Sequence, residues 1–331
     1  MANSEPAAAQ SGPAAGPRSR SLRTLRESST VGLAAVVVLV SAVFAFIAPN
    51  FVTASNIANV ARASAVFGIA ALGITIPMIA GAVDLSFGAI MSLAAIGTAA
   101  QLSSGTPMLQ AMAVGLAIGL GLGILNGVIA TVLHLDSMIV TLGTLSVFGG
   151  VAFMITNAQR TYAPGDDFAF LGRGFLIGVP VPVWIMLAVG GSLALLLRFT
   201  TFGQRCFIVG DNSRAASLSG LSIARTRIAA LAISGVAAAL AGIVITSNDG
   251  LIYAGTGERY LLQGLAAVVI GGTALRGGTG TVVGTLLGIF LLGIVDNGLN
   301  LVGVPGVWQD VLRGLILIGA LVIDRLRDSR L

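Results

Sequence analysis

Long apolar runs recur along nearly the whole chain, and they restrict it to one kind of fold. Hydrophobic residues make up 56% of the 331 residues and charged residues only 9%, far below the roughly 25% of soluble domains. An apolar run of about 18 residues or more crosses a bilayer as a helix, which satisfies its own backbone polar groups there. The sequence therefore predicts an all-α polytopic membrane protein with about ten transmembrane helices. The predicted spans lie near 31–49, 64–82, 86–104, 108–133, 137–156, 179–197, 228–247, 260–275, 281–303 and 307–324.

The polar stretch between the sixth and seventh predicted spans gives the orientation of the chain. It runs from Arg198 to Arg227 with five arginines against one aspartate, so the positive-inside rule places it in the cytoplasm. Ten spans then put the N and C termini in the cytoplasm as well. We expect a disordered tail over 1–28, a transmembrane domain over 29–324 and a short tail over 325–331. The first apolar run could be a cleavable signal, but its length and the many later spans favour a permanent helix.

A short helix signal lies inside this cytoplasmic loop. Asp211 or Asn212 is a suitable N-cap, the helical run continues to Ser219, and Gly220 is typical of the residue just past a helix. A small capped helix at a membrane surface has little of its own protein to bury against. We therefore expect it to dock into another protein, with small residues at the contact and Arg214 at the rim. The residues assigned to this docking segment are Gly210, Asp211, Asn212, Arg214, Ala215, Ala216, Ser219 and Gly220.

Several classes of function are excluded by residue types that the chain lacks. All 18 basic side chains are arginine, so the lysine of a phosphate-binding P-loop is missing and any ATP hydrolysis has to come from a partner. One cysteine and one histidine do not make a metal cluster. No Ser/His/Asp set, zinc-protease motif or paired-carboxylate cleft is evident, so we expect no catalytic residue, metal or cofactor in this chain. The net charge of +5 fits loops that face anionic lipid, and no basic face is left for nucleic acid.

Glycines recur at every fourth residue in two of the predicted spans. At helical pitch such residues share one face, and that face lets the backbone of a second helix approach closely in lipid. The stripes therefore predict tight helix packing, and they are also compatible with helices that slide during gating. Their members are Gly115, Gly119, Gly123 and Gly127, and Gly280, Gly284 and Gly288.

Few polar side chains fall within or near the spans, where each one is costly. Asp84 lies between two apolar stretches and either caps the next helix or lines a solute path. Asn126 either bonds a neighbouring helix or faces the path. The same two alternatives hold for Asp296, Asn297 and Asn300, late in the ninth span. Because the ionisable set is so small, transport driven by proton or ion coupling is disfavoured.

Four segments, taken in order, resemble one family of transporters. They are LGITIPMIAGAVDLSFGAIMSL, GLGILNGVIATVLHLDSMIVTLGTL, TFGQRCFIVGDNSRAASLSGL and LAAVVIGGTALRGGTGTVVGTLLGIFLLGIVDNGLNLVGV. Together they look like the membrane permease subunit of ribose/xylose/galactoside-type ABC importers. The resemblance covers nearly the whole chain after residue 30, and its motifs are specific in combination.

The resemblance implies a ten-helix importer subunit in a bacterial inner membrane. Two permease chains, identical or closely related, would sit on two ABC ATPase subunits that hold the ATP and magnesium. A periplasmic or lipid-anchored sugar-binding protein would deliver the ligand. The coupling helix of the family, which the ATPase grips, falls on Gly210–Gly220.

The chain departs from the family pattern at two places. Asp296 and Asn297 stand where relatives commonly have two asparagines, which puts the sugar specificity in doubt. Asp211 stands where relatives often have glycine. Two other interpretations remain: an amino-acid-type ABC permease of similar build, and a secondary transporter that works alone.

Overall fold

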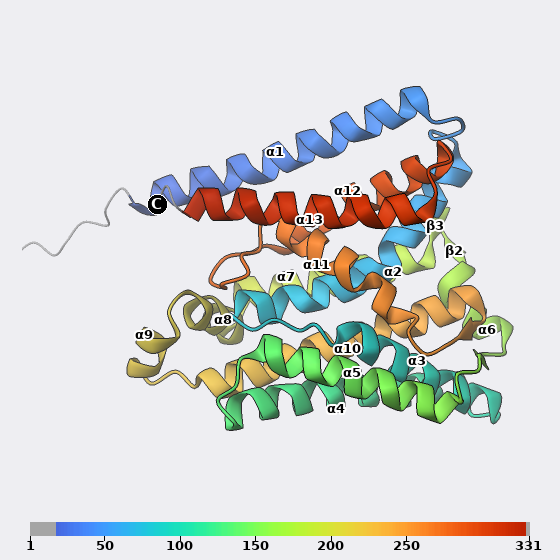
Figure 1. The fold of residues 1–331 in the computed structure, drawn as a ribbon, viewed down its shortest axis with the longest axis horizontal. Helices are drawn as coiled ribbons and strands as arrows, with labels where there is room; N and C mark the ends of the chain where they lie inside the picture. The colour runs from blue at the N-terminus through green and yellow to red at the C-terminus, as the bar shows by residue number, and fades with distance from the viewer. Residues whose placement is uncertain (1–17, 329–331) are drawn as a thin grey trace, which may run out of the picture.

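The computed structural model describes residues 18–328 and shows a bundle of long helices that run side by side (Figure 1). Residues 1–17 and 329–331 of the two predicted tails lie outside the described part, and the first helix begins at Arg18. A helix occurs at each of the ten predicted spans. The ten helices are α1 (Arg18–Ile47), α2 (Ala54–Ile79), α3 (Phe87–Ser103), α4 (Met108–Val132), α5 (Ser137–Thr156), α7 (Val181–Phe199), α10 (Ile223–Asp249), α11 (Leu261–Ile270), α12 (Val282–Leu301) and α13 (Gly306–Asp328).

Only some of these helices cross a membrane unaided. Among the described residues, seven are long and apolar enough, namely α1, α2, α4, α5, α7, α10 and α12. The helix α3 has 17 residues, and α11 has ten, which is about 15 Å of helix against a hydrocarbon core of about 30 Å. The predicted span over 260–275 therefore contains a helix that is too short to cross alone, and the crossing at this place stays a prediction.

The two ends of the bundle carry different short elements (Figure 1). One end holds α8 (Thr201–Asp211) and α9 (Ser213–Leu218), and the other holds α6 (Asp166–Arg173) and two antiparallel ribbons. We refer to them as the α9 end and the α6 end. The ribbons pair β1 (Thr161–Tyr162) with β4 (Leu251–Ile252), and β2 (Phe175–Leu176) with β3 (Val179–Pro180).

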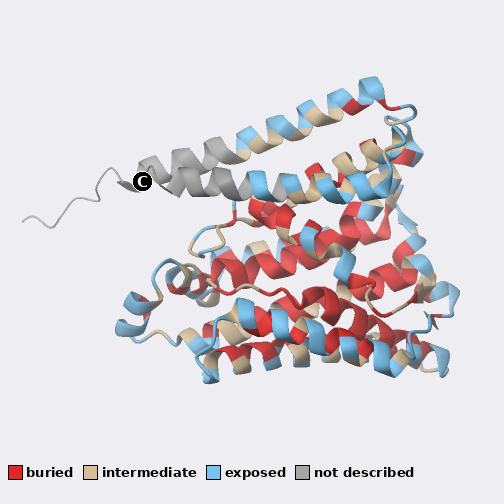
Figure 2. Ribbon diagram, in the orientation of Figure 1, coloured by how far each residue is buried: buried red, intermediate tan, exposed pale blue. Residues whose placement is uncertain are grey.

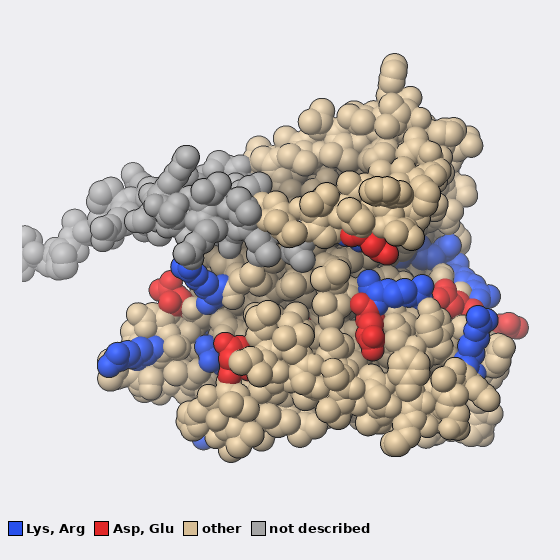
Figure 3. Space-filling view, viewed as in Figure 1, with Lys and Arg blue, Asp and Glu red and all other residues tan. Residues whose placement is uncertain are grey.

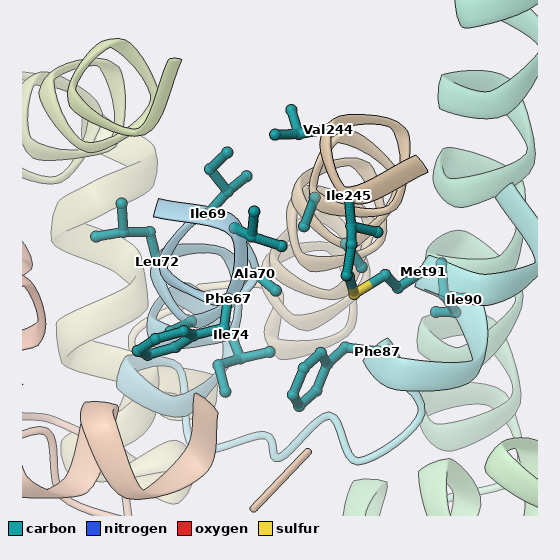
Figure 4. Packing of buried hydrophobic residues seen from close by; sticks show 14 of the residues in the cluster. Phe67, Ile69, Ala70, Leu72, Ile74, Phe87, Ile90, Met91, Val244 and Ile245 are labelled. Carbon is teal, nitrogen blue, oxygen red and sulfur yellow. The ribbon is translucent and has the colours of Figure 1, made fainter. Parts of the chain in front are cut away.

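The centre of the bundle is formed by α10 together with α2, α3 and α4. Buried residues concentrate there, whereas α1 and the outer sides of α4 and α5 are exposed (Figure 2). Figure 4 shows the packing of α2, α3 and α10, where Phe87, Met91 and Ile245 lie between the helices. The exposed apolar residues of the outer helices are suited to lipid, which solvates them as well as a protein core would.

The glycine stripes lie at the closest helix contacts. A Cβ on Gly119 or Gly123 would overlap backbone carbonyl oxygens of α10, so α4 and α10 touch backbone to backbone. On α12, Gly284 and Gly288 meet α11 and the residue after it in the same way. Gly280 lies outside this pattern, because α12 begins at Val282 and Thr281 is its N-cap.

Two crossings are interrupted near the middle of the bundle. The chain turns at 80–81 and is non-helical over 82–86 before α3 starts, and α11 is preceded by a turn and the short 3-10 helix η1 (Gly257–Tyr260). The two interruptions meet: the N–H of Gly257 donates to Ser92 Oγ of α3 at 2.9 Å, and a Cβ on Gly88 would lie 2.8 Å from the carbonyl oxygen of Gly257. Non-helical backbone at membrane depth persists only where protein buries it or water lines it.

Candidate functional site

A polar cavity of about 490 Å³ lies in the half of the bundle nearer the α6 end. It is bounded by α2, α10, α12, α13 and the η1–α11 segment, and its volume is in the range of roughly 300–1,000 Å³ found for small-molecule sites. Most of its polar groups are amides, which both donate and accept hydrogen bonds. The polar lining consists of Asn59, Arg62, Asn248, Asp249, Tyr260, Gln263, Asp296, Asn297, Asn300, Gln309 and Arg313.

Asp296 is the most connected side chain of this cavity. Its Oδ1 accepts a hydrogen bond from Arg313 Nε at 2.9 Å, and its Oδ2 accepts one from Gln263 Nε2 at 2.5 Å. Arg313 also donates from Nη1 to Asp310 at 2.7 Å. A single carboxylate thus joins α11, α12 and α13 at the wall of the cavity, which accounts for an aspartate where two asparagines were expected.

Replacing Asp296 with leucine is expected to destabilise the bundle, because Arg313 and Gln263 lose their acceptor. The side chains of the ion pair are 18% and 24% exposed, so we expect a loss of about 1–3 kcal/mol rather than the 3–5 kcal/mol of a fully buried pair. Thermal unfolding of the purified protein in detergent should show a midpoint lowered by a few degrees. Asp296→Asn keeps the shape and one acceptor and should fall between the two. An unchanged midpoint for Asp296→Leu would mean that the ion pair adds no stability.

Asn297 and Arg62, two further polar residues of the cavity, differ in how many of their hydrogen-bonding atoms have a partner. Asn297 exchanges a pair of amide hydrogen bonds with Asn56, both 2.9 Å, and so ties α12 to α2. Arg62 stacks over the ring of Phe175 at 5.0 Å, while its buried Nε has no hydrogen-bond partner within the described residues. A ligand oxygen in the cavity would satisfy that donor. Neither Arg62 nor Arg313 was singled out from the sequence: Arg62 lies just before a predicted span, and Arg313 within the last one was overlooked.

Asp84 and Asn126 lie away from this cavity. Asp84 is 1% exposed and accepts bonds from the backbone and hydroxyl of Ser86, at 2.9 and 2.7 Å, and from Ser234 Oγ at 2.6 Å. Asn126 is fully buried and donates to the same Ser86 hydroxyl at 2.7 Å. The pair therefore links the interruption before α3 to α4 and α10. In this conformation the two residues hold helices together, and Asp296, Asn297 and Asn300 are the candidates that reach the cavity.

The predicted docking segment forms α9 at the opposite end of the bundle. Asn212 is its N-cap, with Oδ1 accepting the N–H of Ala215 at 2.9 Å, and Gly220 has a φ of +78°, in the left-handed region that glycine adopts readily. Asp211 ends the preceding helix α8 instead of capping α9. Of the two N-caps that the sequence allowed, Asn212 is therefore the one that starts this helix.

The exposed face of α9 differs from the one expected. Ala216 is 1% exposed and packs within its own chain, so it is not available to a partner. Arg214 lies two residues before Ala216 and Leu218 two residues after it, so both lie on the opposite face of the helix. Both side chains are exposed. Leu218 is 85% exposed, so it is the large apolar side chain that this face of α9 presents. Sequence reasoning missed Leu218 because it considered small residues alone.

Glycines join the α8–α9 segment to the rest of the bundle. The N–H of Gly278 donates to the carbonyl oxygen of Ile79, the last residue of α2, at 2.9 Å. A Cβ on Gly210 would overlap that same oxygen, and a Cβ on Gly277 would lie 2.7 Å from the Cα of Gly81 and 2.9 Å from that of Gly210. We call Gly81, Gly210, Gly277 and Gly278 the glycine junction. Through it, α8 contacts both the end of α2 and the loop between α11 and α12.

Comparisons with known proteins agree with this architecture. Residues 56–321 match the family model described as branched-chain amino acid transport system / permease component. The chain is 38% identical to the ribose import permease of Bacillus subtilis, over 90% of this chain and 92% of the relative. It is 33% identical to the ribose import permease of Haemophilus influenzae, over 88% and 91% of the two chains, and 34% identical to the L-arabinose transport permease of Escherichia coli, over 89% of each. No solved structure matches.

The family model matches most of the chain, and the relatives are similar to it over nearly their whole length. The protein therefore belongs to the permease-component family of branched-chain amino acid transport systems, which in these comparisons includes sugar import permeases.

Proposed function

We propose that this chain is the membrane-spanning subunit of an ABC importer that carries a monosaccharide, such as a pentose, across a bacterial inner membrane. The observation that carries the proposal is the polar cavity near the α6 end. Sugars present many hydroxyl groups that donate and accept, and a wall of amides beside an ion pair complements them. The relatives named for ribose and L-arabinose import support the same ligand class.

The proposed topology has ten crossings with the α9 end in the cytoplasm. Seven helices would cross alone, and α3, α11 and α13 would supply the others, α3 and α11 together with the segments that precede them. The five arginines between Arg198 and Arg227 favour this orientation. The transmembrane domain then covers 29–324, and the cavity faces the periplasm.

The proposed partners follow from the two ends. A separate ABC ATPase, which holds ATP and magnesium, would seat α9 in a surface cleft through Leu218, with Arg214 at the rim. A pocket of about 230 Å³ beside α9, lined by Arg205 and Arg225, would attract acidic side chains of that partner. A periplasmic or lipid-anchored sugar-binding protein would release its ligand at the α6 end. A second permease chain would complete the assembly.

In the proposed mechanism, α9 moves with the ATPase as a rigid body, and the glycine junction passes this motion on. The contacts of Gly210 with Ile79 and Gly278 couple α8 to α2 and to the loop that leads into α12. Residues of α2 and α12 line the cavity. Closing of the ATPase would then tilt α2 against α12 and switch the side to which the cavity opens.

An uptake panel tests the substrate class. The chain is reconstituted with its ATPase and binding protein, and uptake of labelled ribose, xylose, arabinose, galactose and leucine is compared. We expect uptake of one or more of the sugars and none of leucine. Uptake of leucine alone would favour the second candidate, an amino-acid importer, which the description of the family model suggests.

A further inference from the structure

Two charged residues, Glu258 and Arg259, occupy an unexpected depth in the molecule. Both belong to η1 and both are exposed. From the sequence they would be placed in the loop before the eighth span, outside the membrane. Figure 3 shows charges of both signs in the middle of the face that carries η1, apart from the charged groups at the two ends.

Neighbouring helices give the depth of these residues independently. Gly257 bonds to Ser92, which lies 11 residues before the end of α3 at Ser103, or about 16 Å from the α6 end. A Cβ on Gly149 of α5 would lie 2.9 Å from Glu258 Oε1, and Gly149 is seven residues, about 10 Å, from the last residue of its helix. The ten residues of α11 then separate η1 from the α9 end by about 15 Å. The pair therefore lies near the middle of the bilayer.

Exposed charges at this depth do not face lipid. A carboxylate or guanidinium in the hydrocarbon core is costly, and such residues face water-filled cavities or other protein. The place is also the meeting point of the two interrupted crossings, a construction that transporters use at their solute sites. Tyr260, the last residue of the same short helix, lines the cavity, so the pair lies close to its wall.

We infer that Glu258 and Arg259 face a water-filled solute path, closed on its other side by a second copy of this chain, and that the two residues contact the solute at the middle of the membrane. This inference rests on the proposed function. A two-fold assembly brings the same residue of each copy to opposite sides of a shared path, so the path is incomplete in one protomer. Each copy supplies one acidic and one basic group, which suits a neutral polyol and gives no net preference for ions.

The native cysteine leaves the chain ready for a labelling test. Cys206 is fully buried, and burial raises the pKa of its thiol to about 12, so it reacts poorly with thiol reagents. Glu258→Cys and Arg259→Cys are made in the full chain, assembled with its ATPase, and treated in open membrane fragments with a charged, membrane-impermeant thiosulfonate. Leu39→Cys on α1, an apolar position that is 64% exposed, is the lipid-facing control.

We expect the thiols of both η1 variants to be modified at least tenfold faster than the thiol of the Leu39→Cys control. A short bis-maleimide should join two permease chains through position 258 but not through position 39. Modification as slow as at the control position, or no joining of chains at position 258 in a correctly assembled complex, would overturn the inference. Neither readout involves transport. A failure of uptake with fast labelling would therefore count against the proposed function alone, and uptake without labelling would count against this path alone.

Discussion

Leu218→Glu is expected to abolish sugar uptake while the permease still inserts and folds. The side chain is 85% exposed on the face of α9 opposite the buried Ala216, so the substitution disturbs no contact within the chain. In the proposed complex it would place a carboxylate in an apolar cleft of the ATPase without a partner. A penalty of about 3 kcal/mol corresponds to a roughly 150-fold loss of affinity. Co-purification of the ATPase with the permease measures this loss directly.

Two variants serve as controls for Leu218→Glu. Leu218→Met keeps an apolar side chain of similar volume and should retain both ATPase binding and uptake. Leu133→Glu introduces the same charge at another exposed leucine, 60% exposed and just past the end of α4 at the α9 end, away from the docking face. If all three variants bind the ATPase like the parent, α9 is not the docking helix.

Gly210→Val is expected to uncouple ATP hydrolysis from transport. A Cβ at this position would lie 1.9 Å from the carbonyl oxygen of Ile79 and 2.5 Å from the nitrogen of Gly278, so the junction has to open by about 1 Å. Overpacking of this kind costs about 1–3 kcal/mol. Because Leu218 and Arg214 are untouched, the ATPase should still bind and hydrolyse ATP, whereas uptake should fall to below about a tenth.

The control for Gly210→Val is a glycine that meets no neighbour. Gly121 lies on the outer side of α4, where an added Cβ would find nothing within 4 Å. Gly121→Val should leave uptake and ATP hydrolysis unchanged. Normal uptake by Gly210→Val would show that motion does not pass through the glycine junction.

The general architecture could be predicted from the sequence because membrane helices are long, local and strongly apolar. Every predicted span coincides with a helix, and the positions of α4, α5 and α10 follow directly from the lengths of their apolar runs. The start of α9 at Asn212 and its end before Gly220 could also be predicted, since helix capping depends on adjacent residues alone.

Long-range packing could not be read in the same way. The run over 260–275 is apolar along most of its length, but its helix ends at Ile270, where Gly271 packs against the backbone of Gly284 and Gly272 has a φ of +83°. Asp296 looked like an isolated polar residue because its partners, Gln263 and Arg313, come from two other helices. The depth of Glu258 likewise depends on contacts of its short helix with α3 and α5, which the sequence does not show.

In the proposed mechanism, this permease moves only when a separate ATPase acts on α9. Solute accumulation can be compared between liposomes that contain the purified chain alone and liposomes that also contain the ATPase, the sugar-binding protein and ATP. We expect uphill accumulation of sugar in the complete system and none with the chain alone, even when a proton or sodium gradient is imposed. Uphill accumulation by the chain alone would show that the permease does not depend on the ATPase.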